Sequence, residues 1–384
     1  MRLTLAVLLS AALLAPASAC AEASADETRR SDERRMPASV EWEMKGPVRS
    51  DGRIQFQISY REGGGHSIHS EPVPLSAFAG LDRAALTGNG GPVSFRMVRD
   101  AGTFDCEGVA RRERGTGECR FTGNPAFAAE LQRRGIGTPT EYQLFALAVS
   151  ETGREFLAEL DRQGYERPDV DALVKAGWHG ADTAFLKEMG GLGYRVRSLA
   201  ALIRMRDHGV TPSYIRELAA AGLTDLPADT VVQMRDHGVS PGFIGELRQL
   251  GYSGVPVRDL IRLRDHGVSA DYVRRLAAAG LKGLPLNDLI RMRDHGVSSD
   301  FVAALKDSGF GRFAVSDIVR LRDHGVTDSY LRELKALGYS DLGAGDIVRL
   351  RSHGVTSDFI RRMNAANGPR RSATELVDLR IGGR

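Results

Sequence analysis

The sequence lacks the features that mark most enzymes and nucleic-acid-binding proteins. Its 52 lysine and arginine residues nearly balance its 49 aspartate and glutamate residues, and this balance gives no case for binding to nucleic acid or to an acidic surface. The glycine run at 63–65 is not followed by the lysine of a phosphate-binding loop, so we interpret it as a turn. No serine or cysteine is placed by its spacing with a histidine and an orienting third group, as an activated nucleophile would require. We therefore expect no catalytic residue and no cofactor.

Long apolar runs are also absent, except at the start of the chain. Arg2 precedes LTLAVLLSAALLA and the small residues of PASAC, a pattern typical of a secretory signal over 1–20 and too short to span a bilayer. Cys20 follows an A-x-A pattern, which leaves two alternatives: removal with the signal, or lipidation of Cys20 as at the lipobox of a bacterial lipoprotein. Residues 21–39 mix both charge signs and contain Met36 as their only large apolar residue, which predicts a solvated tether. We expect an exported protein of the periplasm or outer envelope, with membrane contact only through a lipid on Cys20.

The other two of the three cysteines fall in a region of strand-like sequence. Apolar and polar residues alternate there in runs separated by the turn sequences SDG, GGG, DAG and RGTG, which predicts a small antiparallel β domain over 40–123. The expected strands are 40–48, 53–61, 93–99, 103–111 and 118–123, and a helix is expected over 75–86. Cys106 and Cys119 lie on successive expected strands, so we predict a cross-strand disulfide in an oxidising compartment.

The rest of the chain repeats itself at a fixed period of 29 positions, the step from His208 to His237. The phrase RDHG, which is RSHG in its last copy, recurs without insertion or deletion, and its histidines are His208, His237, His266, His295, His324 and His353. An aromatic residue keeps the same spacing further upstream, at Phe127, Phe156, Phe185, Tyr214, Phe243, Tyr272, Phe301, Tyr330 and Phe359. A fixed period of this length is typical of stacked repeats. We predict an α-solenoid of about nine helix–turn–helix repeats over 124–384.

Each repeat contains the signals of two helices joined by a tight turn. In the unit 257–284, apolar residues recur on one arc of VRDLIRLRDHG, which predicts the first helix. Gly267 is expected to follow its end in the left-handed conformation, with Val268 making the hydrophobic contact that accompanies such a turn. Ser269 is expected to cap the second helix, ADYVRRLAAA, as Thr211 does in an earlier unit.

Two columns of the repeated phrase suggest different roles. The arginine of the phrase falls within the apolar arc of the first helix, so we expect a structural role, with its stem covered between repeats and its guanidinium bonded to backbone or to an acid. This column is Arg206, Arg235, Arg264, Arg293, Arg322 and Arg351, with Arg380 in the last copy. The histidines fall outside that arc, near helix C-termini that favour a positive side chain, and we expect them to be more exposed and to form a binding surface.

An alternative is that the repeated aspartates and histidines bind a metal or support hydrolysis. Equivalent residues of neighbouring repeats lie about 10 Å apart, which is too far for two of them to share one zinc ion. We therefore expect no metal site in this ladder unless other residues join it.

These features together resemble a family of bacterial envelope proteins. In that family a secretory or membrane-bound N-terminus precedes a β segment, and many hairpins with sequences like HGVTPEFIREL follow. The corresponding stretches here are AGTFDCEG at 101–108, NPAF at 124–127 and HGVTPSYIREL at 208–218. Similar repeats also follow the peptidase domain of proteins that look like β-lactam-sensing antirepressor metallopeptidases. The chain has no H-E-x-x-H motif and no set of membrane spans, so the resemblance implies only a sensing or docking role for the repeats.

The main hypothesis from the sequence is a non-enzymatic envelope protein whose solenoid binds a protein or peptide partner along an extended face. Regular repeats present long surfaces of this kind, although the step from repeat to binding is an argument by analogy between folds. The other hypotheses are a metal-binding or hydrolytic protein that uses the Asp-His ladder, and a structural spacer.

Overall fold

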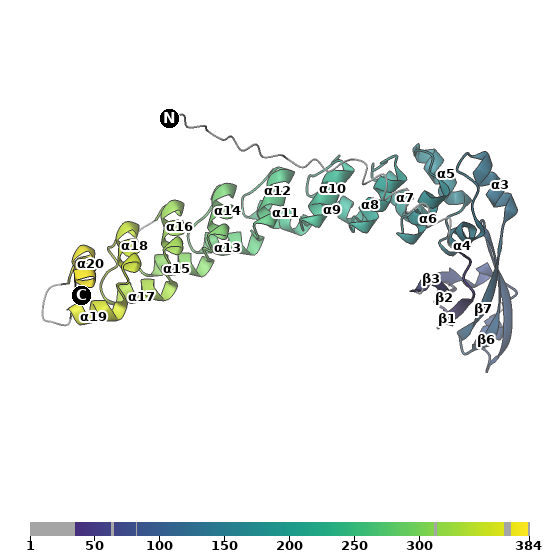
Figure 1. The fold of residues 1–384 in the computed structure, drawn as a ribbon, viewed down its shortest axis with the longest axis horizontal. Helices are drawn as coiled ribbons and strands as arrows, with labels where there is room; N and C mark the ends of the chain where they lie inside the picture. The colour runs from purple at the N-terminus through teal and green to yellow at the C-terminus, as the bar shows by residue number, and fades with distance from the viewer. Residues whose placement is uncertain (1–34, 63–64, 82, 311–312, 365–369, 383–384) are drawn as a thin grey trace, which may run out of the picture. The chain divides into compact units, whose positions relative to one another are not determined.

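The computed structural model describes residues 35–62, 65–81, 83–310, 313–364 and 370–382. The chain is mainly α-helical, with an antiparallel sheet in its N-terminal part (Figure 1). It divides into two compact units, the first ending at Asp207 and the second beginning at His208. The predicted secretory signal and Cys20 lie outside the described residues, as does most of the predicted tether. Among the described helices, none has both the length and the apolar character that a membrane span needs.

The sheet of the first unit has seven strands in the part of the chain that the structure describes. Their order across the sheet is β3-β2-β1-β7-β6-β5-β4, and every neighbouring pair is antiparallel. The strands are β1 (Val40–Lys45), β2 (Arg53–Glu62), β3 (Gly65–Pro74), β4 (Phe78–Ala79), β5 (Gly91–Arg99), β6 (Gly102–Arg111) and β7 (Arg114–Gly123). Because β1 pairs with both β2 and β7, the first and last long strands of the region meet in the middle of the sheet.

Two parts of this region differ from the sequence prediction. β3 is not among the predicted strands, because its residues are mostly small, polar or proline rather than β-branched or aromatic. The helix predicted over 75–86 is wrong: a 3₁₀ turn, η1 (Leu75–Ala77), leads into β4, and the short α2 (Arg83–Thr87) is the only α-helix among the described residues of that stretch. Phe78 is drawn into the sheet core, where its ring centroid lies 5.0 Å from that of Phe56 and 5.2 Å from that of Phe95.

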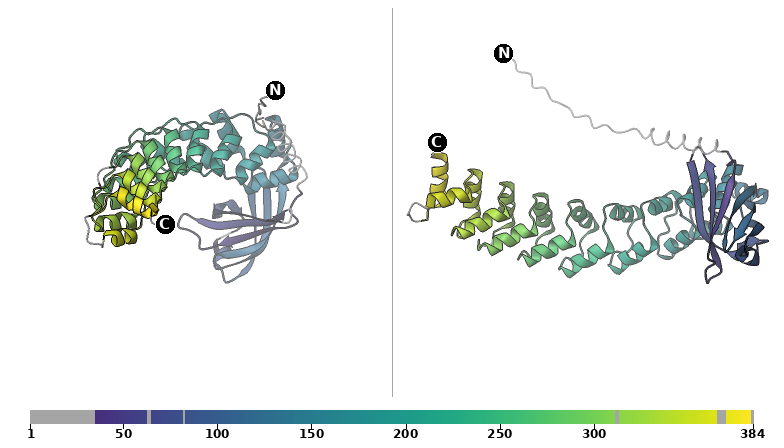
Figure 2. Two further views of the ribbon diagram at one scale, coloured as in Figure 1. Left: turned by 60° about the vertical axis from the view of Figure 1, so that its left-hand side comes forward. Right: turned by 90° about the horizontal axis from the view of Figure 1, so that it is seen from below.

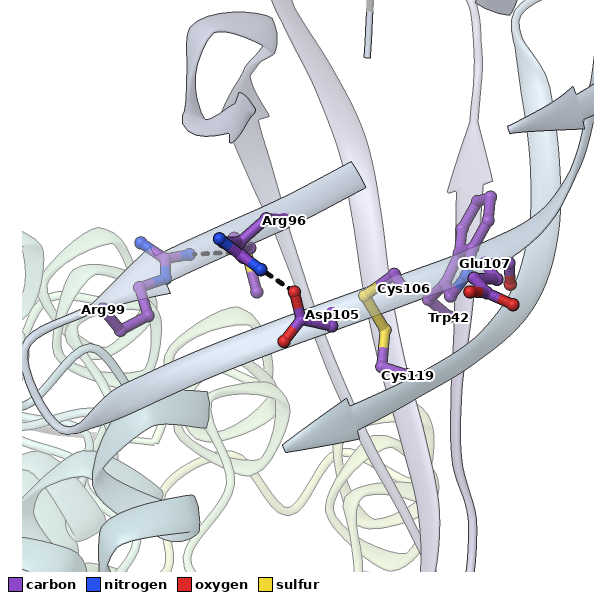
Figure 3. Close-up of a disulfide and its surroundings, with 8 residues drawn as sticks. Trp42, Arg96, Arg99, Asp105, Cys106, Glu107 and Cys119 are labelled. Atoms are coloured by element: carbon purple, nitrogen blue, oxygen red, sulfur yellow. Dashed lines mark hydrogen bonds and ion pairs between the residues drawn. A yellow bond between two sulfur atoms is a disulfide. The ribbon is translucent and has the colours of Figure 1, made fainter. Parts of the chain in front are cut away.

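Trp42 occupies the centre of the sheet core and lies over glycines. Its indole Nε1 donates a hydrogen bond of 3.1 Å to the carbonyl oxygen of Glu107, and the two residues are drawn together in Figure 3. A Cβ atom on Gly117 would lie 2.7 Å from that nitrogen, and one on Gly115 would lie 2.9 Å from the ring. Since real Cβ contacts are longer, these positions must be glycine for the indole to lie flat on the strands.

The disulfide predicted from the sequence is present in the structure. Cys106 on β6 and Cys119 on β7 lie directly opposite each other in the strand register, and their sulfur atoms are bonded (Figure 3). The nearby pair Arg96 and Asp105 is bridged at 2.7 Å on the exposed side of the sheet.

The helices of the first unit follow the sheet directly. They are α3 (Pro125–Arg133), α4 (Glu141–Val149), α5 (Arg154–Gln163), α6 (Val170–Trp178), α7 (Thr183–Gly191) and α8 (Leu199–Asp207). α4 packs against β6 and β7, and the ring of Phe145 lies 5.0 Å from that of Tyr60 and 5.5 Å from that of Phe121. Beyond α4 each helix contacts the next but one, in the pairs α4–α6, α5–α7 and α6–α8.

The second unit has its helices in two rows (Figures 1 and 2). The first row is α10 (Ala228–Asp236), α12 (Val257–Asp265), α14 (Leu286–Asp294), α16 (Val315–Asp323), α18 (Ala344–Ser352) and α20 (Ala373–Gly382). The second row is α9 (Pro212–Ala220), α11 (Pro241–Gln249), α13 (Ala270–Ala278), α15 (Ser299–Asp307), α17 (Asp328–Ala336) and α19 (Ser357–Asn364). Each helix packs against the next helix of its own row.

The helix ends lie where the repeat predicts them. Gly267 has a φ of 67°, and the amide of the fully buried Val268 donates 2.8 Å to the carbonyl of Leu263, which closes the turn between α12 and α13. Ser269 is the N-cap of α13 and accepts a 3.1 Å hydrogen bond from the amide of Tyr272. The predicted capping by Ser269 is therefore confirmed, and Thr211 caps α9 in the same way.

Candidate interaction surface on the helical repeats

The histidines of the repeated phrase pair with aspartates of the next repeat. In each case Nδ1 of the histidine lies within hydrogen-bond distance of Oδ1 of the aspartate that ends the following first-row helix. The pairs are His208–Asp236 at 2.7 Å, His237–Asp265 at 2.5 Å, His266–Asp294 at 2.8 Å and His295–Asp323 at 2.7 Å. We call these four pairs the histidine row. Each pair joins two neighbouring repeats, because the histidine of one phrase bonds the aspartate of the following phrase and not the aspartate of its own phrase.

The histidine row is half-exposed. The side chains of His208 and His295 are 39% and 41% exposed, and that of Asp323 is 43% exposed. Because Nδ1 faces the aspartate, Nε2 is the ring atom left to meet a partner. In the described part of the chain no hydrogen bond engages Nε2 of any histidine in the row.

The last two histidines are held differently. Ser352 replaces the aspartate in the final phrase, and its Oγ lies 3.2 Å from Nδ1 of His324. Nδ1 of His353 bonds instead to the carbonyl oxygen of Arg349, one turn back in the same helix, at 2.8 Å. The row of Asp–His pairs in the second unit thus ends at Asp323.

A seventh histidine of the same register belongs to the first unit. Nδ1 of His179 lies 2.7 Å from Oδ1 of Asp207, and the histidine side chain is 45% exposed. His179 was not predicted from the sequence, because Gly177 and Trp178 stand before it where the repeated phrase has arginine and aspartate. It precedes His208 by one full period, and that spacing would have revealed it.

The arginines of the phrase lie over aromatic rings of the preceding repeat. Each guanidinium carbon is close to the centroid of the ring that the preceding repeat contributes to the aromatic column. The contacts are Arg206 over Phe185 at 5.3 Å, Arg235 over Tyr214 at 5.3 Å, Arg264 over Phe243 at 5.2 Å, Arg293 over Tyr272 at 5.3 Å, Arg322 over Phe301 at 4.9 Å, Arg351 over Tyr330 at 5.3 Å and Arg380 over Phe359 at 5.5 Å. A cation over an aromatic face at this distance is attracted by the ring quadrupole.

The predicted surroundings of these arginines need a correction. They do lie between repeats, but Arg235 and Arg293 are exposed and their main partner is a ring rather than an acid. Backbone bonds add to the stacking in later repeats, where Nε of Arg322 donates 3.3 Å to the carbonyl of Gly296 and Nε of Arg351 donates 2.9 Å to that of Gly325. The flat guanidinium can stack and donate at once, which a lysine could not do.

From Phe185 onward the aromatic column alternates between phenylalanine and tyrosine, and the hydroxyls of Tyr214, Tyr272 and Tyr330 bind the next repeat. The hydroxyl of Tyr272 donates 2.8 Å to the carbonyl of Val297, and that of Tyr214 donates 2.7 Å to the carbonyl of Val239. Burial raises the pKa of both hydroxyls to about 12, against an opposing effect of the arginine above each ring. Where Phe301 stands instead, the corresponding carbonyl of Val326 accepts from Arg322 at 3.1 Å.

No family model, curated protein or solved structure matches this chain.

The chemistry of the surface therefore has to be judged from its own residues. The aspartates and histidines meet in pairs, and in the described residues no three histidine, cysteine, aspartate or glutamate side chains are placed to hold one metal ion. The pairs do have the form in which a carboxylate orients an imidazole, so that each ring presents Nε2 in a fixed direction. What the row offers is a series of similar, half-exposed hydrogen-bonding groups, one for each repeat.

Proposed function

We propose that this chain is a non-enzymatic protein of the cell envelope that binds a protein or peptide along the histidine row. The hairpins of 124–384 would form one α-solenoid, and an extended partner would contact several repeats in turn. The observation that carries the proposal is the recurrence of the same half-exposed Asp–His pair, in the same contact, on consecutive repeats from His208 to Asp323. A partner that meets one such group can meet the next with the same chemistry.

The contacts beneath the row support a binding role rather than a purely mechanical one. Stacked arginines and tyrosine hydroxyls already join neighbouring repeats, as at Arg293, Tyr272 and Val297. An exposed ion pair adds little to stability, typically less than about 1 kcal/mol. A row of such pairs is therefore better explained by recognition than by its contribution to the fold.

The test compares two variants of the full chain in the native host. One carries glutamine at His208, His237, His266 and His295, which keeps a polar side chain and removes the imidazole. The matched control carries glutamine at Arg216 and Arg332, which are exposed on the second-row helices α9 and α17. Affinity capture with quantitative mass spectrometry should find a partner on the wild type and the control but reduced at least about 10-fold on the histidine variant, as expected when several contacts are lost together. Equal capture by all three proteins, or no enriched partner on any, would contradict the proposal.

Metal analysis separates this function from the alternative of a metal-binding or hydrolytic protein. Zinc or copper retained in stoichiometric amount through desalting of the purified chain would favour the metal-dependent alternative, since paired side chains alone hold a metal weakly.

Export is a further part of the proposal. It is supported by the N-terminal sequence and by the disulfide between Cys106 and Cys119, which persists in oxidising compartments. Mass spectrometry of protein from the native envelope should find these cysteines oxidised and Cys20 either lipid-bearing or removed. Free thiols at Cys106 and Cys119 would count against export.

A further inference from the structure

A second candidate surface lies in the first unit, at the edge of the sheet. β3 is the terminal strand, and among the described strands it pairs with β2 alone. A terminal strand leaves one side of its backbone without a strand neighbour, and native edges are normally protected by proline, by charge or by short length. β3 is ten residues long and carries Pro72 and Pro74 only at its C-terminal end. The stretch 65–71 contains no proline.

Two cavities lie along this strand. A cavity of about 260 Å³ is lined by Ile68, Val149 and Trp178 among others, and one of about 430 Å³ continues toward the start of α7. Both are lined by His69, Ser150 and Gly177, so we treat them together as the edge groove. One wall of the edge groove is β3, and the other is made by the ends of α4 and α6 and by the starts of α5 and α7.

The smaller cavity carries unusual apolar exposure. Ile68 is 58% exposed and Trp178 is 41% exposed, and both residues line this cavity. They are two of only six large hydrophobic residues that are exposed in the described part of the chain. Large apolar residues that are exposed at a cavity are typical of a binding site.

The larger cavity is acidic. It is lined by the carboxylates of Glu71, Glu151, Glu155 and Asp182. Two cations partly balance them: Arg99 lies 3.0 Å from Glu71 and also forms an ion pair with Glu151, and Lys187 lies 2.5 Å from Glu155. The carboxylates outnumber these cations, so a basic side chain would complement the cavity.

We propose that the edge groove binds an extended basic peptide, which adds a strand to β3 along residues 65–71. Backbone hydrogen bonds to the open side of β3 would supply affinity that does not depend on sequence. Side chains two positions apart in an extended peptide point to the same side, so an apolar residue would contact Trp178 and a lysine or arginine two positions away would meet the carboxylates near Glu155. This site is independent of the histidine row.

Binding is tested on the full chain with a synthetic probe, the fluorescein-labelled peptide TKTVTKT with blocked ends, whose valine and two lysines lie on one side of an extended strand. We expect saturable binding by fluorescence anisotropy. A TETVTET peptide and a TKTVTKT peptide with alternate backbone amides methylated should each bind at least about 10-fold more weakly, because the first loses the charge complement and the second loses the strand hydrogen bonds. No binding of the lysine peptide, or equal binding of all three, would overturn the proposal.

Variants locate the site. Trp178→Ala and Glu155→Lys should each weaken binding of the lysine peptide at least about 5-fold, as loss of an anchor or of complementary charge does. Val98→Ala, at a residue that is 65% exposed on β5 outside the groove, is the control and should leave binding unchanged. Ile68→Pro places a proline an even number of residues before Pro72 and Pro74 on β3, and it should block the addition of a strand. If that variant unfolds, Trp178→Ala and Glu155→Lys test the site without it. The glutamine variant of the histidine row should bind the peptide as the wild type does. Binding that survives both Trp178→Ala and Glu155→Lys would refute the site.

Discussion

Nδ1 of His266 lies 2.8 Å from Oδ1 of Asp294, and the two residues belong to consecutive copies of the same four-residue phrase. The arginine of the later copy, Arg293, lies over the ring of Tyr272 in the earlier repeat. Asp294 and Arg293 of the later phrase therefore both contact the preceding repeat. The phrase recurs because each copy has to fit the preceding repeat and the following one.

The pairing of His266 with Asp294 should be measurable as a small coupling energy. In a double-mutant cycle with His266→Gln and Asp294→Asn, we expect an interaction of about 0.2–1 kcal/mol from denaturant melts, because both side chains are about two-fifths exposed. The coupling should shrink at high salt, which screens exposed charges. A coupling that does not change with salt would mean that the pair is not electrostatic.

Ser352 offers the reverse experiment. Ser352→Asp restores the aspartate that the last phrase lacks and places it beside His324, which now faces the serine hydroxyl at 3.2 Å. We expect a gain in the free energy of unfolding of about 0.2–1 kcal/mol at low salt. A loss of stability in this variant would argue against the pairing geometry found in the other repeats.

The arginine and the histidine of one phrase should differ in their cost of removal. Arg293→Ala loses the stacking on Tyr272 and the cover that its stem gives to the junction, for which we expect about 1–3 kcal/mol. His295→Ala loses only a half-exposed pair and should cost about 0.5 kcal/mol. The two melts are compared under the same buffer. A larger loss for His295→Ala would make the histidine the structural member and remove it from the candidate surface.

The period of the sequence predicted the two-helix unit and its turn chemistry, but not the contacts between units. Gly267 and Ser269 could be placed because local rules of helix ends act within a few residues. The bond from His266 to Asp294 could not, because a period shows which residues are equivalent and not which unlike residues of neighbouring repeats meet. The helical wheel placed Arg264 on the packed side without showing that its partner is the ring of Phe243.

The edge groove could not be predicted from the sequence for a similar reason. β3 has few β-branched or aromatic residues, so its strand pattern is weak, and it is ordered by its ten-residue pairing with β2. Trp178 and Ile68 are far apart in the sequence, and only the packing of α4 and α6 beside the sheet brings them to one cavity.

The buried tyrosines should make the protein sensitive to alkali. Burial raises the pKa of Tyr214 and Tyr272 from 10.0 to about 12, so the folded state holds these protons more tightly than the unfolded state does. Their contribution to stability is complete below about pH 10 and is lost as the pH rises toward 12. Between pH 8 and pH 11 the free energy of unfolding should fall for the wild type and for the double variant Tyr214→Phe, Tyr272→Phe. The fall should be smaller in the double variant, by about 1 kcal/mol for each tyrosine removed. Identical pH profiles for the two proteins would contradict this assignment.

The glycine beneath Trp42 should tolerate no side chain. A Cβ atom on Gly117 would lie 2.0 Å from the carbonyl oxygen of Glu107 and 2.7 Å from the indole nitrogen, and neither backbone nor a core indole can move away easily. We expect Gly117→Ala to cost about 1–3 kcal/mol or more in thermal or denaturant unfolding. Gly91→Ala is the matched control, because a Cβ there meets no atom within 4 Å, and it should be close to neutral. Similar losses at both positions would mean that the tryptophan does not lie on the glycines as described.

Removing one repeat should test whether each repeat depends only on its neighbours. Deletion of 263–291 removes one full period and joins Arg262 to Met292, so that α12 continues directly into the end of α14 and the phrase RDHGV is intact. His237 would then meet Asp294 in place of Asp265, and Phe243 would meet Arg293 in place of Arg264. Every contact between repeats is replaced by an equivalent one, so we expect a folded protein with unchanged helicity per residue by circular dichroism.

Deletion of 263–276 removes about half of that length and joins α12 to the end of α13, which leaves a first-row helix without its turn, its cap and its second-row partner. This shorter deletion should lose much more helicity and cooperativity than the longer one. If both deletions lost the same amount, stability would be a property of the whole array, and the partner-binding row could not be shortened or extended by whole repeats.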